Sequence, residues 1–541
     1  MKNKFINVLK KQLDDNVSHQ FDIAFVELSK TDVHKSITYG EFYKKVYKLG
    51  EQLIQNGYQN TKVILYMSNN IDSIINLFSC FYANIIPIIK SYNTDNIEID
   101  KYVDEINVLL NNFNKINYVF LDNILYEKVK SELNIDNVIN LNNICPNDLI
   151  FECNDKIDNF DFVLSTSGST AIPKCVKISI DKMFSNILFD NNLWEVNKNS
   201  KFLNWLPISH IYGLTSIVFI PLYFGATSYL MKPHDYYDNC YLWIESIFKY
   251  RITHTSIINF ALNQLSLIDN IGDNIDLSSL QNLSIGGESV KLNSVRTFYN
   301  KYKKYNLKFN VFSPSYGMSE NSGLVSEYKS DFGQPLSIKV DRKLLIEGKM
   351  KEDKYGIEIV NLGQIDKNNV LISSKNGDYY NNDDEIGEVV LNDKSLCSGY
   401  LNNNQEFPKY FHTGDLGFIH NDCLYLCGRI KDVIVIRGKN FASSLICDTI
   451  SNTLSKTNVG INTFITLPDN DDSIYFVQEV LKPLNTHELK LEIQEVIKSY
   501  TKYDIPLENI ILIKSSDLPK LSSGKLDKIT LTNLIMGGVL K

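Results

Sequence analysis

The sequence predicts an α/β protein in which a large N-terminal domain of parallel-rich sheets with flanking helices precedes a small α+β domain. Its 541 residues exceed what one hydrophobic core normally serves, which indicates at least two domains. Helical periodicity alternates with short apolar runs through most of the chain, as it does in parallel α/β folds. After Arg429 the chain becomes compact and rich in lysine, so we expect domains at 1–428 and 429–541.

The first two repeats of this alternation lie near the N-terminus. Apolar residues recur at helical spacing over 39–53 and again over 71–83. Each of these predicted helices is followed by a buried, β-rich run, 62–67 after the first and 85–89 after the second. This βαβ rhythm predicts parallel strands with helices on the faces of the sheet.

The same rhythm continues through the rest of the large domain. Further strands are predicted at 118–121, 162–165, 227–231, 253–257 and 283–285. Parallel strands of this kind carry ligand-binding loops at their carboxyl ends. In the small domain, apolar residues share one face of a predicted helix over 488–500.

The uncharged segment from Ile211 to Met231 is long enough to span a bilayer. It contains Gly213, Pro221, Gly225 and several polar residues. We therefore expect a buried helix that runs into a buried strand, and no membrane span. The N-terminus, residues 1–16, lacks a signal-peptide core and is typical of a short amphipathic helix.

Charge and cysteine content exclude several classes of function. A net charge of −8 argues against a nucleic-acid partner, because phosphate neutralisation needs a basic face. The 9 cysteines are odd in number and include no C-x-x-C pair, so neither a disulfide scaffold nor a structural zinc site is expected. Reduced thiols are typical of a cytoplasmic protein.

The strongest chemical motif is the run Ser165-Thr-Ser-Gly-Ser-Thr-Ala-Ile-Pro-Lys174, directly after the predicted strand 162–165. Small hydroxylated residues around Gly168 let backbone N–H groups approach an anion, and Lys174 adds positive charge. The order of a Walker A loop is absent. A Ser/Thr-rich solvated turn is the alternative interpretation of this motif by itself.

This run resembles the phosphate loop of the adenylate-forming superfamily, which comprises acyl- and aryl-CoA synthetases, luciferases, adenylation domains and fatty acyl-AMP ligases. Five further motifs similar to those of the superfamily follow in order. They are Asn204–His210, Gly286–Val290, Ser315–Glu320, Thr413–Asp415 with Gly428–Gly438, and Pro519–Lys525. The chain is therefore identified as a member. The resemblance implies a β-barrel-like subdomain in the large domain and a mobile small domain.

The resemblance also implies the residues that bind ATP. For the β- and γ-phosphates they are Thr166, Ser167, Gly168, Ser169, Thr170 and Lys174. For the adenine they are Gly287, Glu288, Ser315, Tyr316, Gly317, Met318 and Ser319. Asp415 can accept hydrogen bonds from both ribose hydroxyls, and Arg429 can bond to ribose or phosphate. Glu320, with Thr166, is the expected Mg²⁺ ligand, since Mg²⁺ prefers few carboxylates plus phosphate oxygens.

Three more residues receive roles through the resemblance. Lys525 is the expected catalytic lysine, which neutralises the substrate carboxylate and the α-phosphate so that they can approach. Lys431 lies at the expected hinge. His210 is expected to form a gate or wall of the acyl pocket, because a carboxylate nucleophile needs no general base at neutral pH.

Several segments resemble the fatty acyl-AMP ligase branch in particular. They are Asn259–Ala261, Ser322–Ser326, the long connection between Lys329 and Gly387, Gly414–Phe418 and Ile436–Asn440. In that branch the insertion is thought to restrict the domain rotation needed for CoA. The resemblance thereby implies a fatty acid substrate and an acyl carrier protein as acceptor. The lysines of the small domain are then either the face on which the acidic carrier protein docks or an ordinary solvated surface.

Other functions stay open. An acyl-CoA synthetase remains possible because His210–Gly213 resembles that group equally, and an amino- or aryl-acid adenylating enzyme is a further alternative. A non-catalytic homologue is disfavoured because Lys174, Glu320, Asp415 and Lys525 are all present. The sequence departs from the superfamily at Ala171, where glycine is usual and a positive φ would be hindered.

Overall fold

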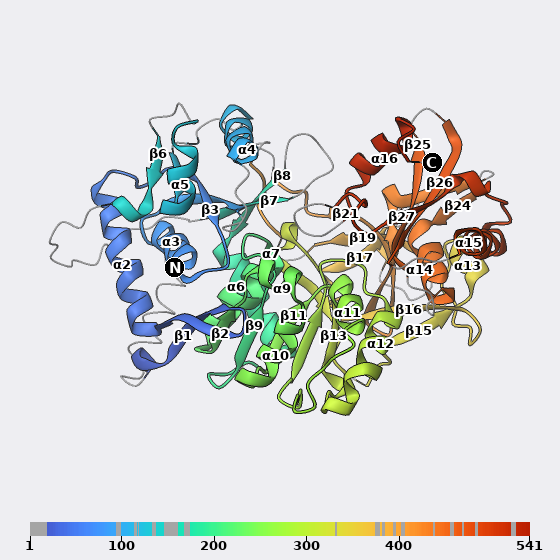
Figure 1. Ribbon diagram of the computed structural model, residues 1–541, viewed down its shortest axis with the longest axis horizontal. Helices are drawn as coiled ribbons and strands as arrows, with labels where there is room; N and C mark the ends of the chain where they lie inside the picture. Colours follow the sequence, from blue (N-terminus) through green and yellow to red (C-terminus); the bar gives the residue numbers. More distant parts are fainter. Residues whose placement is uncertain are drawn as a thin grey trace. The chain divides into compact units, whose positions relative to one another are not determined.

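Figure 1 shows the computed structural model of the protein. The chain forms two compact units. Unit 1 comprises Met1–Val290, Ser294–Gln334 and Asp393–Lys409, and unit 2 comprises Lys291–Asn293, Pro335–Asn392 and Tyr410–Lys541. The structure describes residues 19–92, 99–112, 116, 118–132, 137–144, 161–166, 174–330, 333–373, 379–380, 385–392, 396–401, 406–436, 439–454, 459–467, 470–481, 485–520 and 526–540.

The first sheet of unit 1 has the order β20-β8-β7-β4-β3-β5-β6. Its strands are β3 (Lys62–Met67), β4 (Ile86–Ser91), β5 (Tyr118–Leu121), β6 (Val138–Asn140), β7 (Asp161–Thr166), β8 (Lys174–Ser179) and β20 (Gly399–Tyr400). The central pairs are parallel, whereas β8 runs antiparallel to both of its neighbours. Helix α2 (Tyr39–Gln55) precedes β3, and α3 (Ile71–Tyr82), α4 (Ile99–Asn112) and α5 (Asn123–Val129) connect the strands from β3 to β6.

The second sheet of unit 1 has the order β14-β13-β12-β11-β9-β10-β1-β2. Its strands are β1 (Ile23–Ser29), β2 (Asp32–Thr38), β9 (Lys201–Asn204), β10 (Thr227–Leu230), β11 (His254–Ile257), β12 (Asn282–Ile285), β13 (Phe312–Met318) and β14 (Gly323–Glu327). All pairs from β1 to β13 are parallel, and β2 and β14 add antiparallel edges. The main helices are α6 (Ile180–Trp194), α9 (Pro233–Asp238), α10 (Tyr241–Tyr250), α11 (Asn259–Ser266) and α12 (Leu292–Tyr302).

The uncharged segment 211–231 is a buried helix followed by a strand, which confirms the expectation from its sequence. It consists of α7 (Ile211–Leu214), a π-helical turn η3 (Thr215–Phe219), α8 (Ile220–Phe224) and then β10. The π-turn is fully buried, and Gly225 ends α8 with a φ of +71°, a conformation that favours glycine. No helix in the described part of the chain is long and apolar enough to cross a membrane.

A cluster of phenylalanines forms the centre of the unit 1 core. Phe78 of α3 lies 5.5 Å from Phe42 of α2, 5.6 Å from Phe81 and 6.0 Å from Phe219 of the π-turn, measured between ring centroids. Phe25 of β1 extends the cluster at 5.3 Å from Phe42. The edge-to-face geometry of most of these pairs adds attraction to the burial of apolar surface. The same core therefore holds helices of both sheets in place.

Unit 2 contains an open sheet, a hairpin and a small three-stranded sheet. The open sheet consists of β15 (Ser337–Val340), β16 (Ile357–Gln364), β17 (Val370–Ser373), β18 (Tyr379–Tyr380), β19 (Gly387–Leu391), β21 (Phe411–His420) and β22 (Cys423–Arg429). The other strands are β23 (Val433–Ile436), β24 (Lys439–Ala442), β25 (Val459–Leu467), β26 (Asn470–Val480) and β27 (Ile510–Lys514). The helices are α13 (Arg342–Ile346), α14 (Ser443–Thr453), α15 (Thr486–Thr501) and α16 (Lys528–Met536).

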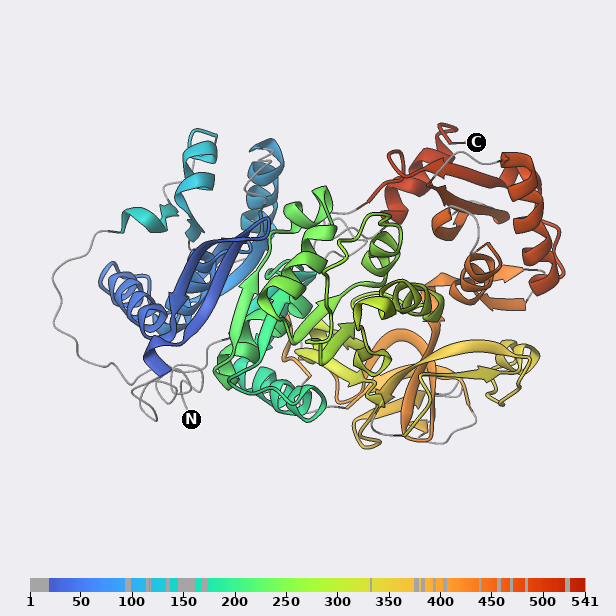
Figure 2. The same ribbon diagram turned by 60° about the horizontal axis from the view of Figure 1, so that its bottom comes forward.

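The predicted α/β fold class is confirmed, with one correction. The described strands from β18 to β16 follow an open path, so the expected barrel-like subdomain is an open sheet in this part of the chain. The elements after residue 440, drawn orange to red, gather around the three-stranded sheet in both views (Figures 1 and 2). The mixed parallel and antiparallel pairing of that sheet fits an α+β unit. The boundary expected at Arg429 stays a prediction.

We expect Phe78→Ala to destabilise unit 1 by about 3–5 kcal/mol, because Phe78 is completely buried and the surrounding rings cannot collapse into the space it leaves. Urea unfolding followed by tryptophan fluorescence measures this loss. Phe21→Ala is the matched control, since Phe21 is 72% exposed and its truncation should change stability by less than about 0.5 kcal/mol. Equal effects of both substitutions would contradict the assignment of Phe78 to the core.

Candidate functional site

The predicted phosphate loop lies between β7 and β8 of unit 1. The antiparallel register pairs Thr166, the last residue of β7, with Lys174, the first residue of β8. Lys174 is exposed at the mouth of this hairpin. The predicted loop residues Ser167, Gly168, Ser169 and Thr170, and the side chain of Thr166, lie outside the described residues.

The motif Ser315–Glu320 forms the carboxyl end of β13 and the turn that follows it. Ser315 is buried and its hydroxyl donates to the carbonyl of Ile285 at 3.2 Å. Tyr316 is 8% exposed. Beyond it the chain turns sharply: a Cβ on Gly317 would lie 2.6 Å from the carbonyl oxygen of Gly323, so only glycine fits there.

Met318, Ser319 and Glu320 complete that turn. Met318 is half-buried at the end of β13, and Ser319 and Glu320 belong to a short 3₁₀ helix, η6 (Ser319–Asn321). The Glu320 carboxylate accepts a hydrogen bond from the hydroxyl of Tyr400 at 2.9 Å. The turn thus leads the chain directly from Tyr316 to the carboxylate expected to bind the metal.

The third motif, at the end of β12, lies against β13. A Cβ on Gly286 would lie 2.4 Å from the Ser315 hydroxyl, and Gly287 has a φ of +77°. Gly287 therefore favours glycine through its positive φ, whereas a Cβ at Gly286 would force the Ser315 hydroxyl to move. Glu288 accepts a hydrogen bond from the backbone N–H of Phe260 at 2.5 Å, so its carboxylate caps the N-terminus of α11.

His210 is exposed and occupies the N-cap position of α7. Its Nδ1 accepts a hydrogen bond from the backbone N–H of Tyr212 at 3.2 Å. The Tyr212 ring turns inward, lies 3.4 Å from where a Cβ of Gly287 would be, and donates its hydroxyl to Ser284 at 3.1 Å. Burial raises the pKa of Tyr212. The sequence singled out His210 but missed Tyr212, which connects the predicted gate to the ends of β12 and β13.

A buried carboxyl, which the sequence did not reveal, lies beneath this group. Glu327 of β14 pairs across the sheet with Ser315, is fully buried, and accepts a hydrogen bond from the indole N–H of Trp194 at 2.5 Å. Burial raises its pKa to about 8, so the carboxyl is mainly protonated at neutral pH. Its neighbour Ser326 is also completely buried, so no alternation of polar and apolar residues along β14 could have predicted the burial of Glu327.

Unit 2 brings together the two residues expected to bind ribose. Asp415 of β21 and Arg429 of β22 are cross-strand partners, and the guanidinium Nε donates to the carboxylate at 2.8 Å. Asp415 is buried, while the Arg429 side chain is 55% exposed. Lys431 is exposed in the 3₁₀ turn Ile430–Asp432 that follows β22.

Lys525 lies outside the described residues, but both ends of the segment that carries it are described. Lys520 and Leu526 form an isolated antiparallel bridge. The Lys520 ammonium donates to the buried carboxylate of Glu479 at 3.0 Å. On the other side, Asp527 accepts from two backbone N–H groups and caps α16. These contacts fix the ends of the segment in unit 2.

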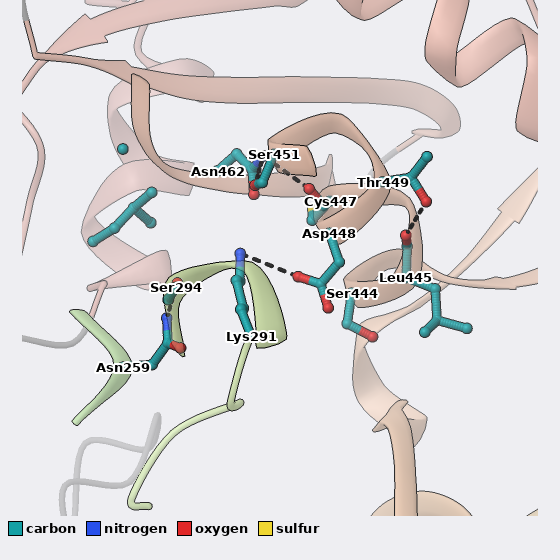
Figure 3. A network of polar contacts seen from close by, with 12 residues as sticks. Asn259, Lys291, Ser294, Ser444, Leu445, Cys447, Asp448, Thr449, Ser451 and Asn462 are labelled. Carbon is teal, nitrogen blue, oxygen red and sulfur yellow. Dashed lines mark hydrogen bonds and ion pairs between the residues drawn. The ribbon is translucent and has the colours of Figure 1, made fainter. Parts of the chain in front are cut away.

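Asn259, one of the residues that resemble the acyl-AMP ligase branch, has a buried structural role. It begins α11 and donates to the hydroxyl of Ser294 in α12 at 3.3 Å (Figure 3). Figure 3 also shows Lys291 directed at Asp448 of α14, with 3.1 Å between the charged atoms. Both residues of that ion pair belong to unit 2.

The chain matches the AMP-binding enzyme family over residues 14–401, and it therefore belongs to this family. It is 26% identical over 547 residues to the medium-chain-fatty-acid–[acyl-carrier-protein] ligase JamA of Moorena producens, covering 93% of this chain and 90% of that protein. It is also 26% identical over 403 residues to the probable long-chain-fatty-acid–AMP ligase FadD30 of Mycobacterium tuberculosis, covering 67% of this chain and 68% of that protein.

Solved structures agree with this fold. A fatty acyl-adenylate ligase from a study of the E. coli and L. pneumophila enzymes has a TM-score of 0.84 at 18% identity, and the match covers 99% of this chain and 98% of that one. A fatty acyl-adenylate ligase from L. pneumophila in complex with acyl adenylate and pyrophosphate has a TM-score of 0.71 at 22% identity, over 99% and 96% of the two chains. The predictions of the adenylate-forming superfamily and of an AMP-forming ligase are confirmed.

The buried carboxyl of Glu327 gives a pH-dependent prediction. The folded protein holds this proton up to about pH 8, whereas an unfolded glutamate releases it near its ordinary value of 4.5. Between these values the folded state binds more protons, so this group lowers stability as the pH rises. Glu327→Gln keeps an acceptor for Trp194 without a charge. Its stability relative to the wild type should therefore increase from pH 5 to pH 8 in urea unfolding experiments.

Proposed function

We propose that this enzyme activates a fatty acid with ATP to give acyl-AMP and pyrophosphate, and then passes the acyl group to the phosphopantetheine thiol of an acyl carrier protein. The observation that carries the proposal is that Lys174 and Glu320 both contact Tyr400 in unit 1 of a chain from the AMP-binding family. The relatives JamA and TtuA, which are fatty-acid–[acyl-carrier-protein] ligases, support the choice of acid and acceptor.

The first step is an in-line attack of the fatty acid carboxylate on the α-phosphorus of ATP. A P–O bond forms to the acid, the bond to the pyrophosphate oxygen breaks, and pyrophosphate leaves with that electron pair. The step requires positioning and charge neutralisation more than proton transfer. We assign phosphate binding to the loop 166–170 with Lys174, and adenine binding to the end of β13 around Tyr316.

Glu320 fits the requirements of a Mg²⁺ ligand. Mg²⁺ in nucleotide sites is bound by one or two carboxylates together with phosphate oxygens and water, so a single glutamate suffices as the protein ligand. The Tyr400 hydrogen bond engages Oε1 of Glu320. When bound, the ion would neutralise phosphate charge. The role of Thr166 as its companion stays a prediction.

The residues of unit 2 complete the proposed chemistry. Asp415 is held against Arg429 and presents a carboxylate suited to two ribose hydroxyls. Lys525 would neutralise the two anions that meet at the α-phosphorus. We propose that Lys431 is the hinge between residues 1–428 and 429–541, and that the enzyme is cytoplasmic, in keeping with seven described cysteines of which none forms a disulfide.

Carrier protein is preferred over CoA as the acceptor because of a contact inside unit 2. Arg342 of α13, from the long connection that resembles the branch-specific insertion, stacks its guanidinium 3.5 Å from the centre of the Tyr500 ring on α15. A cation–π contact of this kind contributes about 0.5–2 kcal/mol. It supports the idea that the insertion restrains the small domain.

One assay tests both halves of the proposal. Purified enzyme is incubated with ATP, hydroxylamine and a panel of fatty, aryl and amino acids, and hydroxamates report the adenylates. CoA or a holo acyl carrier protein is then supplied as acceptor. We expect hydroxamate with fatty acids and transfer to the carrier protein. Fast acyl-CoA formation would support an acyl-CoA synthetase instead, and absence of any adenylate would support a non-catalytic homologue.

Lys525→Ala should reduce adenylate formation by at least about 100-fold, because two anions would then approach without neutralisation. ATP binding, measured by calorimetry, should change less than about threefold. Lys498→Ala is the matched control, since Lys498 pairs with Asp504 on an exposed helix face. Adenylation at the wild-type rate in Lys525→Ala would refute the role of Lys525.

A further inference from the structure

Tyr400 is a residue of unit 1 that the motifs left without a function, and it contacts two of the proposed ATP-binding groups. It ends the short strand β20, which pairs antiparallel with β8 so that Tyr400 lies opposite Val176. Its hydroxyl donates to Oε1 of Glu320 at 2.9 Å. The Lys174 ammonium lies 5.4 Å from the centre of its ring.

The backbone near Tyr400 also contacts the turn that carries Glu320. The N–H of Cys397 donates to the carbonyl of Glu320 at 2.8 Å, and its thiol donates to the carbonyl of Ser319 at 3.2 Å. The backbone N–H of the adjacent Leu401 donates to the carbonyl oxygen of Cys175 in β8 at 2.7 Å. The segment 396–401 therefore ties the glutamate turn to the strand that begins with Lys174.

We propose that Tyr400 is a positioning residue that orients the Glu320 carboxylate for the divalent cation and, through its ring, steadies Lys174 for the phosphates. This inference rests on the proposed ATP-dependent function. The two contacts use different parts of the side chain, since the hydroxyl serves Glu320 and the ring serves Lys174.

The chemistry of each contact supports this division. A phenol that donates to one oxygen of a carboxylate fixes the rotation of the group and leaves the second oxygen for a cation. An aromatic face attracts an ammonium group and limits the positions that the flexible lysine adopts.

A purely structural role is the alternative explanation. Tyr400 is half-buried and packs edge-to-face on Phe407 with 4.8 Å between ring centroids. If packing were its only role, removal of the hydroxyl would lower stability slightly and leave cation dependence unchanged. The two explanations thus predict different responses to Mg²⁺.

The experiment compares Tyr400→Phe and Tyr400→Leu with the wild type. Calorimetry measures the binding of a non-hydrolysable ATP analogue without metal and at increasing Mg²⁺, in the absence of fatty acid. Tyr400→Phe should raise at least about fivefold the Mg²⁺ concentration at which half of the Mg²⁺-dependent gain in analogue affinity is reached. Its affinity for the analogue without metal should change less than about twofold. Tyr400→Leu should also weaken metal-free binding at least about threefold, because Lys174 loses the ring.

Tyr82→Phe is the matched control. The Tyr82 hydroxyl of α3 donates to the Glu51 carboxylate of α2, so the substitution also removes a tyrosine–glutamate hydrogen bond within unit 1. It should leave both measurements unchanged. An unaltered Mg²⁺ requirement in Tyr400→Phe, or an equal shift in Tyr82→Phe, would overturn the inference. A wild type that binds the analogue with Mg²⁺ but activates no acid would count against the proposed function alone.

Discussion

The close approach of backbone at the carboxyl ends of β12 and β13 constrains the part of the candidate site that lies in unit 1. Gly317 faces the backbone carbonyl of Gly323 at a distance where a Cβ cannot be accommodated, and a Cβ at Gly286 would displace the Ser315 hydroxyl. Strand ends packed this tightly can lead into a narrow turn, and that turn presents Tyr316 and then Glu320. Without it the aromatic ring and the carboxylate would belong to separate loops, each with its own freedom to move.

Buried polar groups lie beneath these strand ends and hydrogen-bond to one another. The Tyr212 hydroxyl bonds to Ser284, and the protonated Glu327 carboxyl is held by Trp194. A neutral carboxyl in this position avoids the large desolvation cost of a buried charge. Lys174 and Glu320, the side chains proposed to bind phosphate and cation, both contact Tyr400 instead.

Residues far away in the sequence provide the hydrogen-bond partners of Glu320 and Asp415. Tyr400 reaches Glu320 across 80 positions of sequence because β20 pairs with β8. In unit 2, a fixed antiparallel register places Asp415 opposite Arg429. Both cases follow from strand pairing, which gives a side chain a defined neighbour whatever the separation along the chain.

The sequence by itself determined the fold class, seven of the fifteen strands described in unit 1, and the order of the motifs, because apolar periodicity and glycine placement are local properties. The helix predicted at 488–500 and the segment 211–231 follow from the same rules. Only the tertiary structure decided the partners of Glu320, the burial of Glu327 and the role of Tyr212. These depend on register between strands and on exclusion of water, and neither is encoded in the neighbourhood of the residue concerned.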